Sequence, residues 1–438
     1  HVGAWPADLY YAELDGPWTD DLVSWEPWGV AVRNHNIPGD GYFDQSRLPS
    51  DVDLILGRID LSDLPVYGST PEVELLRAYL DRNHSFRTGA LTFQRKAVIH
   101  ENFPGLDHES AAFRSCIPMF GEENVYQDQF IASLAQESHL WSMAGGPGSY
   151  TSASGIGTSQ EVANTPLNGA FAHMIGSYFG DWDTPDNFMR STLASGSMLG
   201  VVWGLQEIAF HHMALGLPIG ESVRRSQNAS YNEYERQGRL INMALMGDPT
   251  LPLFPAPYVE MMDLEINANG VLVQWTEVTG DIVGYHVYRR TDPTQHFIRL
   301  NAVPVASATY LDTEPVGGNV EYMVRALKLE TSASGTFEVL GTGKRATMNV
   351  VLNIHDRTSY GPVIYPIPNP GSFVLRSPML DSGIQVRLFD LSGGELPLTM
   401  TRSEGEFTIA TEAATGMYIL QIITSEGAQI KRSIGIVR

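Results

Sequence analysis

Apolar and polar positions follow two different patterns along the chain. Over roughly the first 255 residues, short apolar runs alternate with stretches of helical spacing. Residues 52–57 form an apolar run that ends in Gly57, which is typical of a buried strand. Thr70 and Pro71 predict a helix start, because Thr can cap a helix and Pro fits its first position. Further apolar runs lie at 97–100, 140–144, 170–175 and 198–203. This alternation predicts a mainly parallel sheet covered by helices.

From residue 257 to 352 the chain reads as short strands. Runs at 271–275, 285–288 and 322–326 are rich in branched and aromatic residues, and turn residues separate them. About seven short strands fit this region, which predicts a β-sandwich. The positions of Trp275, Tyr288 and Tyr322 resemble a fibronectin type III module. The resemblance implies that Trp275 is a core aromatic and Tyr322 a corner tyrosine.

Residues 353–362 are a polar stretch that we interpret as a linker, and a second all-β unit is expected from 363 to 438. Three phrases follow in order: Pro-Asn-Pro-Gly at 368–371, Asp-Leu-Ser-Gly-Gly at 390–394 and Gly-Met-Tyr at 416–418. Their order at the end of the chain resembles the sorting domain of type IX secretion substrates of the Bacteroidetes. The resemblance implies recognition by the type IX secretion machinery and an extracellular or outer-membrane-surface location.

Composition narrows the classes of function. The chain has 438 residues, with 28 Lys and Arg against 50 Asp and Glu, so its formal net charge is −22. About three domains of ~150 residues fit this length. The acidic balance argues against nucleic-acid binding, which needs clustered cations. No apolar run reaches the ~20 residues of a membrane-spanning helix. Cys116 is the only cysteine, which excludes an intrachain disulfide.

Three phrases in the first 256 residues carry a second resemblance. They lie at 8–16 (Asp-Leu-Tyr-Tyr-Ala-Glu-Leu-Asp-Gly), 53–59 (Asp-Leu-Ile-Leu-Gly-Arg-Ile) and 245–251 (Leu-Met-Gly-Asp-Pro-Thr-Leu). They resemble the C-terminal part of a gingipain-type peptidase domain, which implies a caspase-like α/β fold. We interpret 1–256 as such a domain without its N-terminal part. The expected fold class is therefore multidomain: a caspase-like α/β domain, then two all-β sandwich domains.

The two catalytic places of that family are occupied by unsuitable residues. The family places its general base, a His, in a Gly-His-Gly loop after one strand, and its Cys nucleophile after the next strand. The sequence has Pro147 in the first loop and Ser177 at the second place. A thiolate needs a Cys and an adjacent imidazole, and a Ser depends on a base even more. These degenerate positions predict an inactive domain.

Other residues could supply chemistry. His211 and His212 are expected on a helix with Glu207, where Glu207 and His211 share a face. They could form part of a metal site or, like His173, act as a base for Ser177; ordinary packing is the alternative. Cys116, in a predicted loop, could be a nucleophile, but a lone Cys is more often an apolar packing residue.

Oxygen-rich residues around glycine turns in the N-terminal loops suggest calcium. Asn36, Asp40 and Asp44 lie around Gly39 and Gly41. Calcium takes six to eight oxygen ligands and tolerates irregular loops. A solvated acidic surface explains the same residues equally well, so both interpretations stay open.

Two functional hypotheses follow. The first is a secreted or cell-surface protein with an inactive gingipain-like domain that acts as a structural, adhesive or assembly component, including as a homo-oligomer. The second is an active divergent peptidase or hydrolase that uses Ser177 with His173, His211 or His212, or a residue of the missing N-terminal segment. A His nitrogen within hydrogen-bond reach of Ser177 would favour the second.

Overall fold

The computed structural model describes most of the chain. The described residues are 8–20, 39, 41, 43, 48–105, 107–204, 208–229, 239, 243–351, 363–376, 383–403, 406–423 and 429–438. The chain divides into two compact units, His1–Val350 and Val351–Arg438. The linker predicted at 353–362 lies outside the described residues.

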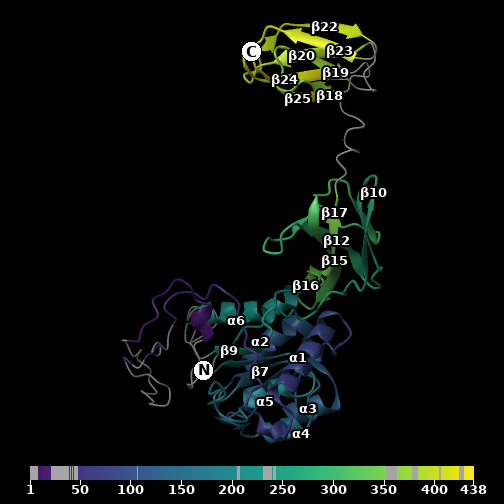
Figure 1. Ribbon diagram of the computed structural model, residues 1–438. Helices are drawn as coiled ribbons and strands as arrows, with labels where there is room; N and C mark the ends of the chain where they lie inside the picture. Colours follow the sequence, from purple (N-terminus) through teal and green to yellow (C-terminus); the bar gives the residue numbers. More distant parts are fainter. Residues whose placement is uncertain are drawn as a thin grey trace. The chain divides into compact units, whose positions relative to one another are not determined.

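A six-stranded mixed sheet forms the centre of the α/β part (Figure 1). In spatial order its strands are β2 (Val125–Gln127), β1 (Ala97–Glu101), β3 (His139–Gly145), β7 (Gly169–Ile175), β8 (Gly200–Gly204) and β9 (Met243–Gly247). The pairings from β2 to β8 are parallel, and β9 runs antiparallel to β8. Every residue of β3 and β7 is buried, as expected for central strands covered on both faces.

Helices cover both faces of this sheet (Figure 1). One core cluster unites the sheet with α2 (Glu109–Phe120) and α6 (Ile219–Asn228). The other unites it with α3 (Phe130–Gln136), α4 (Ser159–Asn164) and α5 (Phe188–Ala194). The long α1 (Glu72–Arg87) contributes residues to both clusters, including Tyr79 and Phe86.

Two local expectations in this part are wrong. Residues 52–57 are not a strand: their backbone is held by the Asn228 side chain and by Ala12, and only Arg58 forms an isolated bridge, with Met246. Helix α1 begins at Glu72, and Pro71 occupies the N-cap position without a side-chain cap.

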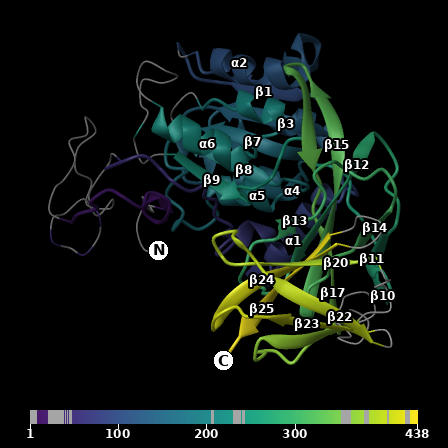
Figure 2. The same cartoon turned by 90° about the horizontal axis from the view of Figure 1, so that it is seen from above.

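The sandwich that follows has two sheets. One has the order β10 (Met262–Asn267), β11 (Gly270–Trp275), β14 (Thr309–Asp312). The other contains β13 (Ile298–Arg299), β12 (Ile282–Arg290), β15 (Gly318–Ser332) and β16 (Gly335–Leu340), and β17 (Lys344–Val350) also pairs with β15. Figure 2 shows the long β12 and β15 running side by side.

Trp275 and Tyr322 are buried in the core of this sandwich, as predicted. The Tyr322 hydroxyl donates a hydrogen bond to Asp312 Oδ2 at 2.7 Å. Tyr285, rather than the half-buried Tyr288, packs against Trp275, with their ring centroids 5.1 Å apart. The pattern of aromatic residues therefore identified the strand but not which of its tyrosines faces inward.

The hairpin of β15 and β16 packs on the α/β part. Arg95 holds the buried carboxylate of Glu330 with two hydrogen bonds, at 2.8 and 3.0 Å. Phe337 packs against the core cluster that contains α2 and α6. The Ser334 hydroxyl also donates to the carbonyl of Pro118, at 2.8 Å. These contacts explain why both parts belong to one compact unit.

The C-terminal unit is a separate antiparallel sandwich. One sheet has the order β18 (Val363–Tyr365), β19 (Ser372–Arg376), β23 (Glu406–Thr411), β22 (Leu398–Ser403). The other has the order β21 (Glu395–Leu396), β20 (Gln385–Phe389), β24 (Gly416–Ile423), β25 (Gln429–Ile436). Tyr418, Leu420 and Ile422 are all buried, which fits the predicted alternation along β24. No helix in the described part of the chain has the length and apolar character needed to cross a membrane.

Candidate functional site

The loops that follow β3 and β7 meet at the carboxyl edge of the sheet. Gly145 and Ile175 are in register at the strand ends, and the Gly146 amide donates to the Ile175 carbonyl at 3.0 Å. Gly148 lies so close to Ser177 that a Cβ atom on it would overlap the Ser177 backbone. Only glycine fits this approach. The loop of Pro147 and the loop of Ser177 are therefore in direct contact, although 30 residues of sequence separate them.

The chemistry at this meeting point is poor for catalysis. Pro147 and Ser177 are both exposed, and Pro147 has no group that can accept a proton. Among the residues the structure describes, none forms a hydrogen bond with the Ser177 hydroxyl, and no imidazole lies within hydrogen-bond reach of it. Without a base, this hydroxyl stays protonated near neutral pH and is a weak nucleophile.

His173 lies on β7, four residues before Ser177, but its ring is buried in the core. It is 4% exposed and packs edge-on against Phe210, with ring centroids 5.2 Å apart. Its Nε2 has no hydrogen-bond partner within the described ranges. Burial, with a smaller contribution from the charge of His108, lowers the pKa of His173 to about 3. The ring is therefore neutral at pH 7 and is enclosed by packing.

His211 and His212 begin a 3₁₀ helix, η5 (His211–Leu215), and their rings stack with centroids 4.2 Å apart. Burial lowers the pKa of both. Residues 208–210 are not helical, and Glu207, which was expected to share a helical face with His211, lies outside the described residues. No contact joins either ring to Ser177 in the described structure.

Cys116 lies inside α2, not in a loop as predicted. It is fully buried, and burial raises the pKa of its thiol well above the ordinary value. A thiol in this environment stays protonated and inert. Its place in the core cluster with Trp141 and Phe171 is that of a packing residue.

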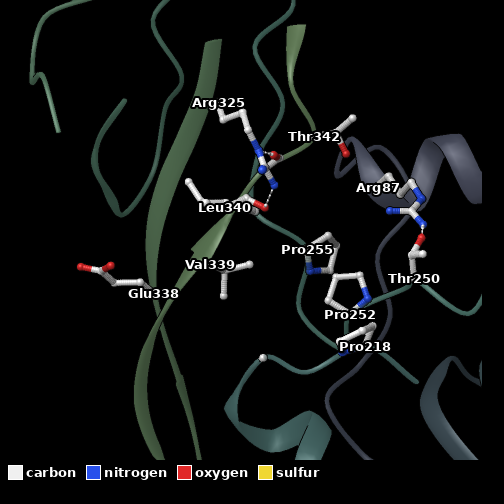
Figure 3. A pocket seen from close by; sticks show the side chains of 13 residues that line it. Arg87, Pro218, Thr250, Pro252, Pro255, Arg325, Glu338, Val339, Leu340 and Thr342 are labelled. Carbon is white, nitrogen blue, oxygen red and sulfur yellow. Dashed lines mark hydrogen bonds between the residues drawn. The ribbon is translucent and has the colours of Figure 1, made fainter. Parts of the chain in front are cut away.

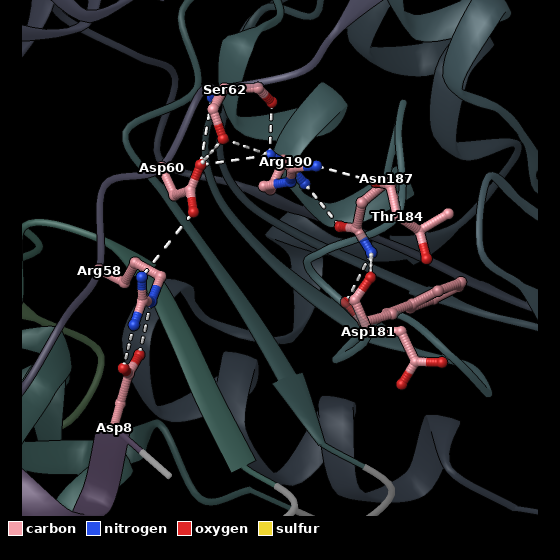
Figure 4. Close-up of polar contacts among 9 residues, drawn as sticks. Asp8, Arg58, Asp60, Ser62, Asp181, Thr184, Asn187 and Arg190 are labelled. Carbon is pink, nitrogen blue, oxygen red and sulfur yellow. Dashed lines mark hydrogen bonds and ion pairs between the residues drawn. The ribbon is translucent and has the colours of Figure 1, made fainter. Parts of the chain in front are cut away.

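The loop after β7, residues 176–187, is anchored by a buried polar network (Figure 4). Asn187 caps α5 by accepting a hydrogen bond from the Arg190 amide, and its side-chain amide donates to the carbonyls of Phe179 and Asp181. The Arg190 guanidinium, 1% exposed, donates to the Thr184 carbonyl at 2.8 Å and forms an ion pair with Asp60. Hydrogen bonds from Asn187 and Arg190 thus hold the backbone of this loop at Phe179, Asp181 and Thr184.

Asp60 and Arg58 extend this network. Burial alone would raise the pKa of Asp60, but hydrogen bonds from Ser62 and the charge of Arg190 outweigh it, so the pKa is lowered and the carboxylate stays ionised. Arg58 forms an ion pair with Asp8 and lies over the Trp182 ring, 4.8 Å from its centroid. The sequence phrases at 8–16 and 53–59 therefore contribute to the support of this loop through Asp8 and Arg58.

Backbone strain is concentrated at the same place. Of the four residues other than glycine with positive φ in the described structure, three lie here: Asp63 (47°), Tyr178 (67°) and Asp186 (54°). The Asp186 amide donates to the Asp63 carbonyl at 3.0 Å, so two strained residues stabilise each other. Such conformations persist only where the surroundings hold them, and they are enriched at functional sites.

Tyr178 and Tyr150 form an aromatic pair at this edge, with ring centroids 5.0 Å apart and ring planes at 40°. Tyr178 is 48% exposed. Sequence reasoning missed both tyrosines. The available signal was that Tyr178 directly follows Ser177 and that Tyr150 lies in the hydroxyl-rich phrase Ser-Tyr-Thr-Ser-Ala-Ser at 149–154.

The calcium prediction cannot be placed in this structure. Asn36, Asp40 and Asp44 all lie outside the described residues. The neighbouring Gly39 and Gly41 donate their amides to the carboxylate of Asp20, at 2.9 and 2.7 Å. The described residues include no group of three or more His, Cys, Asp or Glu that could hold a metal ion.

A cavity of about 240 Å³ lies elsewhere in the first unit, where the α/β part meets the sandwich (Figure 3). Arg87, Thr250, Arg325 and three prolines contribute to its walls. Arg87 is paired with Asp248, and Arg325 donates to the Gly341 carbonyl at 2.8 Å. Its lining includes neither the Pro147 loop nor the Ser177 loop, so these loops are not part of this cavity.

Comparison with known proteins gives little. No family model matches the chain. Among solved structures, a segment of two fibronectin type III domains from chicken tenascin aligns at 13% identity, covering 40% of this chain and 98% of that segment, with a TM-score of 0.17. A likeness this weak supports no argument about fold or function.

Proposed function

We propose that this chain is a secreted or cell-surface protein whose gingipain-like domain is inactive. In this proposal it reaches the extracellular side through type IX secretion and acts there as a structural, adhesive or assembly component. The observation that carries the proposal is the contact between the Pro147 and Ser177 loops at the carboxyl edge of the sheet. Two neighbouring strand ends are where a caspase-like domain needs its base and nucleophile, and both residues there are unsuitable.

The C-terminal sandwich supports the export part of the proposal. It forms a compact unit of its own, as a module with a separate sorting role would need. The Asp390 carboxylate organises the turn of the Asp-Leu-Ser-Gly-Gly phrase by accepting from the amides of Ser392 and Gly394, at 2.8 and 2.9 Å. The phrase that carries the resemblance thus has a defined structural role in this unit.

Peptide hydrolysis tests the catalytic part of the proposal. The full chain and Ser177→Ala are incubated with a fluorogenic peptide library and with a denatured protein substrate. We expect both to cleave no faster than buffer does, because Ser177 lacks a base. Cleavage by the wild type that Ser177→Ala abolishes would overturn the proposal and favour the divergent hydrolase. Circular dichroism of both proteins serves as the folding control.

A further inference from the structure

An aromatic pair, the exposed Tyr178 and the half-buried Tyr150, lies where the Pro147 and Ser177 loops meet. Tyr178 presents nearly half of its surface, and Tyr150 packs beside it with the ring planes tilted by 40°. An aromatic face attracts the slightly positive C–H groups on a sugar ring. Two tilted rings on an open surface form a platform rather than an enclosing cage. Such a platform suits a chain lying across it better than a small molecule.

The backbone strain at Tyr178 indicates that its side chain has a function. A non-glycine residue at φ 67° is strained, and tyrosine is not among the residue types that favour this conformation. The turn is closed by the Asp181 amide, which donates to the Tyr178 carbonyl at 3.1 Å. The strain is maintained by the Asn187 cap and the buried Arg190 ion pair described above. A loop without a function for the ring would be more stable with Gly at this position.

The chemistry around the pair favours a neutral, hydroxyl-bearing ligand. The hydroxyl residues of 149–154 and Ser177 lie on the two loops that meet here, and Asp183 on the second loop is exposed. No Lys or Arg occurs between residues 115 and 189, and the whole chain carries a net charge of −22. The two cations that lie against the second loop, Arg58 and Arg190, are both in ion pairs with carboxylates. Phosphate-bearing and other anionic ligands would therefore be repelled. Hydroxyl and carboxylate groups are suitable hydrogen-bond partners for sugar hydroxyls.

We propose that the surface formed by Tyr150, Tyr178 and Ser177 binds a neutral saccharide chain. The inference rests on the proposed function, because it takes this edge of the sheet to be a binding site rather than a catalytic one. The inference names a class of ligand for the proposed adhesive role. The binding surface would lie where an active gingipain-like domain would have its catalytic pair.

Titration calorimetry of the full chain with cellohexaose, maltohexaose and xylohexaose tests the inference. We expect at least one hexasaccharide to bind, with an affinity that 0.5 M NaCl leaves unchanged, because no ion pair is involved. Tyr178→Gly should weaken binding at least tenfold and keep or raise the melting temperature, because Gly adopts positive φ without strain. Tyr178→Trp should retain binding.

Tyr365→Ala is the matched control, because Tyr365 is exposed and lies on β18, in the other compact unit. It should bind as the wild type does. The inference is overturned if none of the three hexasaccharides binds, or if Tyr178→Gly binds as tightly as the wild type. Binding of tetramethylammonium that depends on Tyr178, without saccharide binding, would also overturn it. Failure of saccharide binding leaves the peptide-hydrolysis result, and so the proposed function, unaffected.

Discussion

His173 shows how one residue of the candidate site affects stability. Its pKa in the folded protein is about 3, against an ordinary value of 6.5, mainly because of burial. Between these two values the unfolded chain binds a proton that the folded protein does not. The contribution of His173 to the free energy of unfolding is therefore fully present above pH 6.5. It is lost as pH falls toward 3, by about 1.4 kcal/mol per pH unit at most.

Replacing this group tests that account. We expect His173→Leu to flatten the fall in unfolding free energy between pH 6 and pH 4 by about 1 kcal/mol per pH unit relative to the wild type. Urea unfolding at several pH values measures it. His296→Leu, which removes an exposed histidine, is the matched control. Parallel pH profiles for the wild type and His173→Leu would show that His173 does not titrate as a buried neutral group.

At the scale of elements, the β15–β16 hairpin joins the sandwich to the α/β part. Glu330, 3% exposed, accepts two hydrogen bonds from Arg95 and one from Lys328 at 2.6 Å. Burial alone would raise the pKa of Glu330, but these hydrogen bonds lower it, so the carboxylate stays charged. Removing its charge leaves both cations without their shared partner.

We expect Glu330→Gln to lower the unfolding free energy by about 1–3 kcal/mol, less than for a fully buried pair, because Arg95 is half exposed. The control is Glu395→Gln, which breaks the surface pair with Arg387 and should lower the unfolding free energy much less, because both side chains are exposed to solvent. Urea midpoints of the three proteins measure the difference. Equal losses in both variants would mean that the Glu330 contact does not stabilise the junction.

The elements that the sequence revealed are those with a purely local signal. The strands β1, β3, β7 and β8 appear as apolar runs because both faces of the sheet are covered. Residues 52–57 show a similar run, but the Asn228 side chain satisfies the Val52 backbone from 176 residues away. Hydrogen bonds of this kind leave no pattern in the local sequence.

The candidate site could be predicted in the same limited sense. Pro147 and Ser177 were singled out through the resemblance to the gingipain family, whose two catalytic places each follow a strand within a few residues, and their catalytic role stays a prediction. The support of the loop did not, because Arg190 and Asp60 are 130 residues apart and meet only in the fold. The positive φ of Tyr178 was also unpredictable, because positive φ is favoured by Gly, Asn and Asp rather than by tyrosine.

For the whole molecule, the division into two compact units matters most. The first unit contains the sheet, the Pro147 and Ser177 loops and the first sandwich, and the second has its own core of residues such as Phe373, Leu388 and Ile434. A unit with its own core can be removed without exposing the core of the other. The proposed division of roles, binding in the first unit and export by the second, can therefore be tested by deletion.

Surface display is the most direct measurement of the central claim. The full chain and a version that ends at Val350 are produced, with the same signal peptide, in a bacterium that has a type IX secretion system. Protease accessibility on intact cells then reports the location of each. We expect the full chain at the cell surface or in the medium. The shortened chain should stay folded in the periplasm, with the thermal transition of the first unit retained. Equal surface display of both chains would contradict the account.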